Sequence, residues 1–277
     1  MRSAPVKFSL TARLTATLFA GLTFTGLAFT CLAFTCLAFT GLALTGVARA
    51  EDAVQTCDVP AYLLTSDSPL PKFAEAVKKS QPVTILVVGS RSSTIPSAEL
   101  SAYPAKLQAA LKEQLPKLAL NLSVELQTGK TAEQAAGTLV KLVEAKKPTL
   151  VIWQTGTVDA MRSVDPDDFR SAVGEGVVAL QTAGTDVILV NLQYSPRTET
   201  MTSAPPYLDN LRVVAQEYDV PLFDRFAIMR HWSDAGDFDL FSTAHGLEMA
   251  KRVHACLGRA LSKFLIDSAH LDPAHQN

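Results

Sequence analysis

Apolar segments alternate with amphipathic segments from about residue 82 to residue 266. Short continuous apolar runs, such as PVTILVVG at 82–89, are typical of strands buried on both faces of a sheet. The segments between them repeat apolar residues with helical spacing, which predicts amphipathic helices. The predicted strands cover 82–89, 120–126, 148–153, 185–192 and 220–224, and the predicted helices cover 101–115, 131–145, 165–184, 206–218 and 246–266.

This alternation predicts a single α/β domain over residues 81–267. We expect a three-layer α/β/α sandwich, in which helices cover both faces of a parallel sheet of about five strands. Residues 51–80 are expected to form an arm, because Pro60, Pro69 and Pro71 disfavour regular structure. Residues 268–277 are expected to form a tail. In such a sheet, the groups that do chemistry lie in loops at the carboxyl ends of the strands.

The first 50 residues have the pattern of a secretory signal peptide. They carry basic residues and no acidic residue, and an apolar stretch leads to Ala48-Arg49-Ala50, a small-residue cleavage pattern. Repeats such as GLAFT and CLAFT make the apolar core long enough to span a bilayer. The segment is therefore either a cleaved signal, with Glu51 as the mature N-terminus, or an uncleaved membrane anchor. We expect an exported protein, periplasmic or extracellular, that contacts a membrane only if the segment is retained.

Charge and cysteine content restrict the partners. Removing residues 1–50 takes away four basic residues, which leaves 21 basic against 27 acidic residues and a net charge of −6. Nucleic acid is therefore not an expected partner. Cys57 and Cys256 remain after removal of the leader, and they either form one disulfide, as an oxidising compartment favours, or stay as buried thiols. The sequence shows no metal-ligand spacing and no phosphate-binding glycine loop, so neither a metal nor a cofactor is expected.

Four loops contain the candidate chemistry. They are GSRSSTIPS after the first strand, QTGKT after the second, QTGTVDAMR after the third, and FDLFSTAHG before the last helix. The order of these loops resembles the SGNH (GDSL-like) hydrolases, a flavodoxin-like α/β/α family of esterases, lipases and polysaccharide deacetylases. The resemblance covers about 185 residues, from the first strand to the last helix.

The resemblance assigns roles to several of these residues. Gly129 would offer its backbone N–H to an oxyanion, and His245 would act as the general base. Gly156 and Asp159 match the loop after the third strand, where Asp159 would support the loop through hydrogen bonds to backbone.

Two other positions depart from the family pattern. Val158 stands where the family has an Asn that donates a side-chain hydrogen bond to the oxyanion, and losing one such donor costs about 2.7 to 4 kcal/mol. Ser242 stands three residues before His245, where the family has the Asp that orients the imidazole. Asp239 is the nearest substitute by sequence.

The nucleophile allows two alignments. Matching Gly89 to the family glycine places Arg91 at the nucleophile, and a guanidinium cannot attack a carbonyl. Shifting by one residue places Ser92 there, in a Ser-x-Thr pattern, and we favour this alignment. Ser90 and Ser93 remain alternative nucleophiles.

These observations predict an exported serine hydrolase of acyl esters with a degenerate active site. By resemblance, its substrate would be a small-molecule ester or an O-acyl group of a glycan. The alternative is a catalytically inactive protein of the same fold that binds a glycan, an acyl ligand or a protein partner.

Overall fold

The computed structural model describes residues 57–241 and 246–272. In this part of the chain, five parallel strands form one sheet in the order β2-β1-β3-β4-β5. This is the flavodoxin-like order, and it confirms the predicted fold class. The strands are β1 (Val83–Gly89), β2 (Leu120–Leu126), β3 (Leu150–Gln154), β4 (Asp186–Val190) and β5 (Leu222–Phe223).

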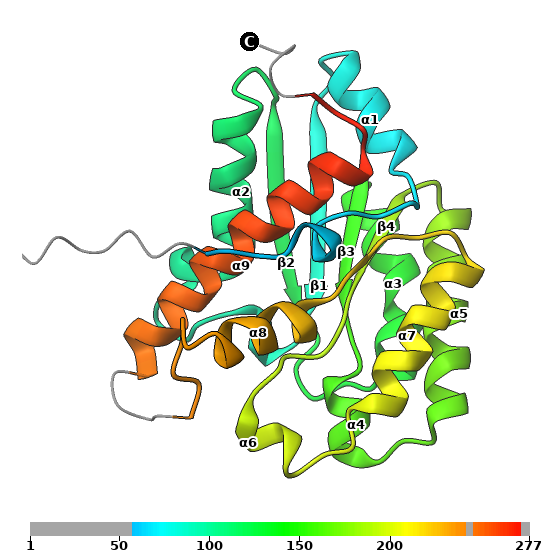
Figure 1. The fold of residues 1–277 in the computed structure, drawn as a ribbon. Coiled ribbons are helices and arrows are strands. Elements are labelled where there is room, and N and C mark those ends of the chain that lie inside the picture. Colours follow the sequence, from blue (N-terminus) through cyan, green and yellow to red (C-terminus); the bar gives the residue numbers. More distant parts are fainter. Residues whose placement is uncertain (1–56, 242–245, 273–277) are drawn as a thin grey trace, which may run out of the picture. The chain divides into compact units, whose positions relative to one another are not determined.

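Helices cover both faces of the sheet (Figure 1). On one face α2 packs against α9, and on the other α5 lies between α3 and α7. These helices are α2 (Tyr103–Gln114), α3 (Ala132–Lys146), α5 (Pro166–Thr182), α7 (Pro205–Glu217) and α9 (Gly246–Ser268). All five were predicted to within two residues at most ends, because their apolar faces repeat with helical spacing. At the start of α3, Thr131 and Gln134 form a reciprocal capping box.

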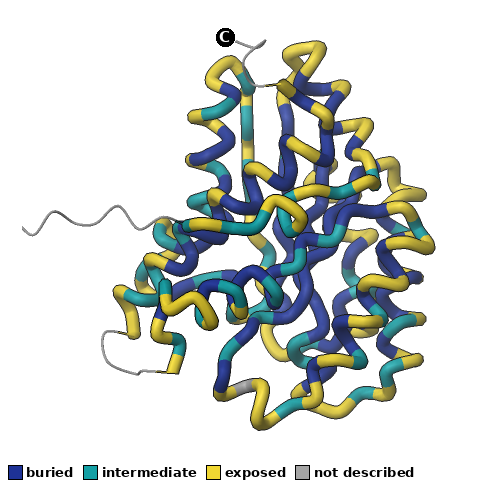
Figure 2. The backbone as a smooth tube through the Cα atoms, in the orientation of Figure 1, coloured by how far each residue is buried: buried dark blue, intermediate teal, exposed yellow. Residues whose placement is uncertain are grey.

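The central strands form the core of the domain. Every residue of β3 and β4 is buried, and β1 is buried at all positions except Thr84, which is partly exposed. The edge strand β2 has no fully buried residue. Figure 2 shows the buried chain concentrated in the middle of the sheet and on the inner faces of the helices.

The expectation that residues 51–80 lack regular structure is wrong for residues 71–78. Helix α1 (Pro71–Lys78) lies there, and Phe73 in this helix is fully buried. Pro71 occupies the first turn, where a helix needs no donor from its backbone nitrogen. The Asp186 Oδ2 atom of β4 accepts a hydrogen bond of 2.9 Å from the Phe73 N–H, so the sheet itself caps this helix.

Short helices also occupy segments that the sequence pattern leaves as loops. They are α4 (Thr157–Arg162), α6 (Pro196–Glu199) and α8 (Arg225–Asp234), with single 3₁₀ turns at Ala61–Leu63, Arg91–Ser93 and Glu99–Ser101. Helix α8 begins at Asp224, whose side chain accepts a hydrogen bond from the Ala227 N–H. Such short helices have too few turns to show a periodic apolar pattern.

The predictions for the leader and for residues 273–277 lie outside the described residues. Among the helices that the structure does describe, none combines the length and the apolar character that crossing a membrane requires. Cys57 and Cys256 form a disulfide with a Cα to Cα distance of 5.2 Å, so the predicted pairing is confirmed and the alternative of two free thiols is wrong. The bond ties the start of the described chain to α9.

Gly258 allows α9 to approach α2 closely. A Cβ atom at this position would lie 2.7 Å from the Leu107 backbone nitrogen and 2.5 Å from the Lys106 Cβ. We expect Gly258→Ala to lower the free energy of unfolding by about 1–3 kcal/mol, because the helix backbones must separate. Gly137→Ala is the matched control in α3, where an added Cβ meets open space, and it should raise stability by up to about 1 kcal/mol. Urea denaturation of both variants checks this, and equal effects would contradict the packing argument.

The disulfide closes a loop of 199 sequence positions. Cys57→Ser should therefore lower the free energy of unfolding by about 2–5 kcal/mol, because the unfolded chain regains the freedom that the link removes. The melting temperature of the parent protein should fall on addition of a reductant, whereas that of Cys57→Ser should not. If the reductant leaves the melting temperature of the parent protein unchanged, the disulfide does not stabilise the fold.

Candidate active site

Loops from four strands meet at the carboxyl edge of the sheet. Ser90 and Ser92 follow β1, Gln154 ends β3, Gln193 follows β4 and Arg225 follows β5. Hydrogen bonds join all five side chains into one cluster. The cluster brings the predicted nucleophile together with two glutamines and an arginine that the sequence patterns do not single out.

The Ser92 hydroxyl has more hydrogen-bond partners in this cluster than the Ser90 hydroxyl. Its Oγ atom accepts hydrogen bonds from Gln154 Nε2 at 2.7 Å and from Arg225 Nη1 at 3.2 Å, and it lies 3.2 Å from Ser90 Oγ. Ser92 as a residue is partly exposed, and these hydrogen bonds hold its hydroxyl in place. Among the described residues, the hydrogen-bond partners of this hydroxyl are two donors and another serine, and none is a base.

The orientation of the Gln154 amide follows from its neighbours. Arg225 Nη1 lies 2.9 Å from one amide atom, and because a guanidinium can only donate, that atom is the oxygen Oε1. Ser93 Oγ also donates to Oε1, at 2.6 Å. The Nε2 group is therefore turned toward Ser90 and Ser92.

Arg225 is buried, with 1% of its surface exposed. Besides Ser92 Oγ and Gln154 Oε1, its guanidinium donates to the Ser92 carbonyl oxygen at 3.0 Å and to Gln193 Oε1 at 3.1 Å. Burial lowers the pKa of Arg225 to about 10, so the side chain is charged at neutral pH.

The residues on either side of Arg225 are fixed by Asn191, which is fully buried just after β4. Asn191 Nδ2 donates to Asp224 Oδ1 at 2.7 Å, and its Oδ1 accepts from the Phe226 N–H at 2.9 Å. The first turn of α8 is thus tied to β4, which sets the direction of the Arg225 side chain.

A second polar layer lies beneath the cluster. Ser93 is 1% exposed, so its hydroxyl faces the interior, where it also lies 3.4 Å from the Tyr103 hydroxyl. The Tyr103 N–H donates to His254 Nδ1 at 3.0 Å. Burial lowers the pKa of His254 to about 3 and raises the pKa of Tyr103, so both side chains are neutral near pH 7.

The loop after β3 contains the predicted oxyanion residues. Gly156, at φ 94°, precedes the one-turn helix α4, which carries Val158 and Asp159. Asp159 is buried, and its Oδ1 accepts a hydrogen bond of 2.9 Å from the Ala132 N–H at the start of α3. Its pKa is raised mainly by burial. Asp159 thus joins the loop after β3 to the segment after β2, in which Gly129 lies at φ 73°.

A small hollow of about 10 Å³ lies between these loops, which is space for roughly one water molecule. Ser90, Gly156 and Val158 line it, together with Gln127 and Lys130 from the loop that contains Gly129. Val158 thus lines the same small hollow as Ser90 of the serine loop.

The remaining predicted residues are not joined to this cluster by described contacts. His245 and Ser242 lie outside the described residues, so the expected base stays a prediction. Asp239 is exposed, and its Oδ1 accepts a hydrogen bond from the Phe241 N–H. Within 57–241 and 246–272, no group of three or more His, Cys, Asp or Glu side chains is arranged to hold a metal ion.

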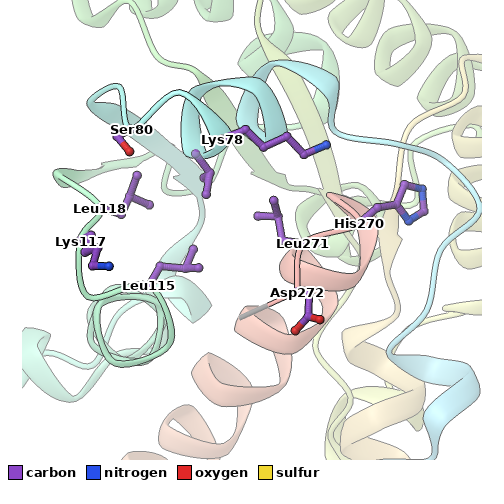
Figure 3. A pocket seen from close by; sticks show the side chains of 9 residues that line it. Lys78, Ser80, Leu115, Lys117, Leu118, His270, Leu271 and Asp272 are labelled. Carbon is purple, nitrogen blue, oxygen red and sulfur yellow. The ribbon is translucent and has the colours of Figure 1, made fainter. Parts of the chain in front are cut away.

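A larger hollow of about 480 Å³ lies beside the amino ends of β1 and β2, whereas the serine cluster lies at the carboxyl ends of the strands (Figure 3). Lysines, a histidine and an aspartate surround an apolar floor there: Lys78, Lys117, His270 and Asp272 around Leu115, Leu118 and Leu271. None of the predicted site residues lines it.

Sequence reasoning missed Gln154, Gln193 and Arg225. Gln154 offered one signal, a polar residue at the end of an otherwise apolar strand. Arg225 offered none, because an arginine after a short strand is usually solvated and its burial depends on the packing of α8.

Comparisons with known proteins agree with this architecture. Residues 56–271 match the non-GDSL lipase-like family. A catalytic mutant of Axe2, an acetylxylan esterase from Geobacillus stearothermophilus, aligns with a TM-score of 0.53 at 15% identity, covering 69% of this chain and 95% of that chain. AlinE4, an SGNH-hydrolase family esterase, aligns with a TM-score of 0.47 at 20% identity, covering 61% and 90% of the two chains. TesA aligns with a TM-score of 0.47 at 21% identity, covering 66% and 99%.

No curated protein sequence matches the chain. The family match spans most of the described residues, and the Axe2 structure shares the fold. The resemblance to SGNH hydrolases, first seen in the order of four loops, is therefore confirmed. The chain belongs to the non-GDSL lipase-like family and has the α/β/α fold of the SGNH hydrolases.

Proposed function

We propose that this protein is an exported hydrolase of carboxylic acyl esters, with Ser92 as its nucleophile. The observation that carries the proposal is the Ser92 hydroxyl, partly exposed at the carboxyl edge of the sheet and held by Gln154 and Arg225. Two donors on one oxygen favour negative charge there, which a serine needs when it attacks a carbonyl. Ser90 is the neighbouring alternative, whereas Ser93 faces the interior.

The proposed reaction has two steps, acylation of Ser92 and hydrolysis of the acyl-serine. Ser92 Oγ attacks the acyl carbon, its proton passes to His245, and the carbonyl oxygen gains negative charge near the backbone N–H groups of Gly129 and Ser92. The bond to the leaving alcohol then breaks, and His245 returns the proton to that alcohol. Water attacks the acyl-serine by the same route in reverse, which releases the acid and restores Ser92. Asp239 would orient His245 in place of the family's Asp.

The proposed substrate class is suggested by a protein of similar fold. Axe2 is described as an acetylxylan esterase, and a short O-acyl group on a glycan is the substrate that we propose here. The leader sequence and the Cys57–Cys256 disulfide support export, because disulfides persist in oxidising compartments.

One observation favours a second function. The Val158 side chain has no hydrogen-bond donor to offer to the hollow beside the serine loop, which would weaken stabilisation of an oxyanion there. A protein that binds a glycan, an acyl ligand or a protein partner without hydrolysing it would need no such donor.

Fluorophosphonate labelling tests the nucleophile. The probe should form one adduct, on the peptide that contains Ser92, because an activated serine attacks phosphorus as it attacks a carbonyl. Ser92→Ala should abolish the adduct, His245→Ala should slow its formation by roughly 100-fold or more, and Ser90→Ala is the matched control that should keep it. An adduct on Ser90 would move the nucleophile, and a folded protein without any adduct would favour the binding function.

Val158→Asn tests whether a donor is missing. If the protein is a hydrolase, this change should raise kcat/KM for p-nitrophenyl acetate by about 10- to 100-fold, because removal of such a donor costs 100- to 1000-fold in other hydrolases. Val158→Ala, which removes bulk without adding a donor, is the control. Equal rates for the two variants would show that the place of Val158 is not an oxyanion site.

A further inference from the structure

Among the described residues, none supplies a counter-ion for the buried charge of Arg225. Its four described hydrogen bonds go to neutral oxygens of Ser92, Gln154 and Gln193, and its Nε atom is buried without a partner. No carboxylate of the described residues forms an ion pair with it. Buried arginines are normally paired, because desolvation of a lone cation is unfavourable. A neutral side chain would link these loops with a smaller desolvation penalty, so hydrogen bonding alone does not account for the charge.

The titratable groups around Arg225 do not neutralise it. Tyr103 of α2 has its ring centre 5.5 Å from the guanidinium carbon, and His254 of α9 is the next titratable group on that side. Both are held neutral near pH 7 by burial. Arg91, in the serine loop itself, is exposed, so water screens its charge. Among the described residues that form hydrogen bonds with the Ser92 hydroxyl or carbonyl group, Arg225 is thus the charged one.

The geometry directs this charge at one residue. Nη1 contacts the Ser92 hydroxyl and Nη2 contacts the Ser92 carbonyl oxygen, so the two arms of the guanidinium hold both the side chain and the backbone of the same serine. The Asn191 contacts to Asp224 and Phe226 prevent α8 from shifting away.

We propose that Arg225 is the positioning residue of this site, which fixes Ser92 in place and electrostatically favours a negative charge on its side chain. The proposal deepens the proposed function and rests on Ser92 being its nucleophile. During attack, the proton of Ser92 leaves for His245 while the guanidinium, which stays charged, stabilises the oxygen that loses it.

The pKa of a cysteine thiol in place of Ser92 reports the local electrostatic field without requiring catalysis. In the full-length Ser92→Cys variant, the rate of alkylation by iodoacetamide is measured against pH, and mass spectrometry of the peptide separates the introduced thiol from the native cysteines. An unperturbed thiol has a pKa of about 8.5. We expect the midpoint to lie roughly 1 to 3 pH units lower, because a cation within hydrogen-bonding distance favours the thiolate.

Second substitutions identify the source of the shift. Adding Arg225→Gln should raise the midpoint toward about 8.5, whereas Arg225→Lys should retain part of the shift, because the charge remains without the two-armed contact. Arg230→Gln is the matched control on the exposed face of α8, where Arg230 lies near Glu199 and Asp234, and it should leave the midpoint unchanged.

A midpoint at or above 8.5 in Ser92→Cys, or one that Arg225→Gln does not move, overturns the proposal. If Arg225→Gln does not fold, Arg225→Lys decides, because it should raise the midpoint above that of the single Ser92→Cys variant while leaving it below about 8.5. The two hypotheses fail separately. A shifted midpoint in a protein that fluorophosphonates do not label would refute the hydrolase function and keep the role of Arg225, whereas labelling with an unshifted midpoint would do the reverse.

Discussion

The site depends on a single amide at the end of a buried strand. Gln154 closes β3, and its two ends face opposite chemical demands: Oε1 accepts from Arg225 and Ser93, and Nε2 donates to Ser90 and Ser92. An amide accepts at its oxygen and donates at its nitrogen, so it can meet both demands with separate atoms. A carboxylate at this position could still accept a hydrogen bond from Arg225. It would have no N–H group to donate to the two serines. The order of the loop after β1 therefore depends on this residue and on the strand that carries it.

The same amide explains why elements outside the family's short motifs matter. Arg225 reaches Gln154 only because Asn191, after β4, fixes the residues on both sides of it. The contact thus links β4, the start of α8, the end of β3 and the loop after β1. A substitution at Asn191 would act on Ser92 at a distance, through the direction of one guanidinium. Because buried polar networks lose stability when they are only partly satisfied, these residues form a unit whose members cannot be changed independently.

The parts that the sequence predicts well are those with a local physical signal. Runs rich in apolar residues identified all five strands, including the alternating segment at 120–126, and helical spacing of apolar residues marked the start of α3 within one residue. Helix α1 was missed because Pro71 was taken to oppose regular structure, although it sits in the first turn, where proline is tolerated. The short helices after β3 and β5 are set by tertiary contacts. For the site, position in a loop at the carboxyl edge placed Ser92 and Gly156 in the right region, whereas the burial of Arg225 is a property of packing that no local pattern contains.

In the proposed acyl transfer, Val158 and Arg225 would affect different steps, so neither could replace the other. The guanidinium contacts the serine itself, so it favours charge on the nucleophile before the carbonyl is attacked. Once the bond to carbon forms, negative charge moves to the carbonyl oxygen, which is where an amide in place of Val158 would donate. Arg225 therefore cannot replace the donor that Val158 lacks. A hydrolase built in this way would depend on backbone N–H groups for the oxyanion and would be fastest on esters whose leaving groups depart easily, since these need the least stabilisation of the tetrahedral intermediate.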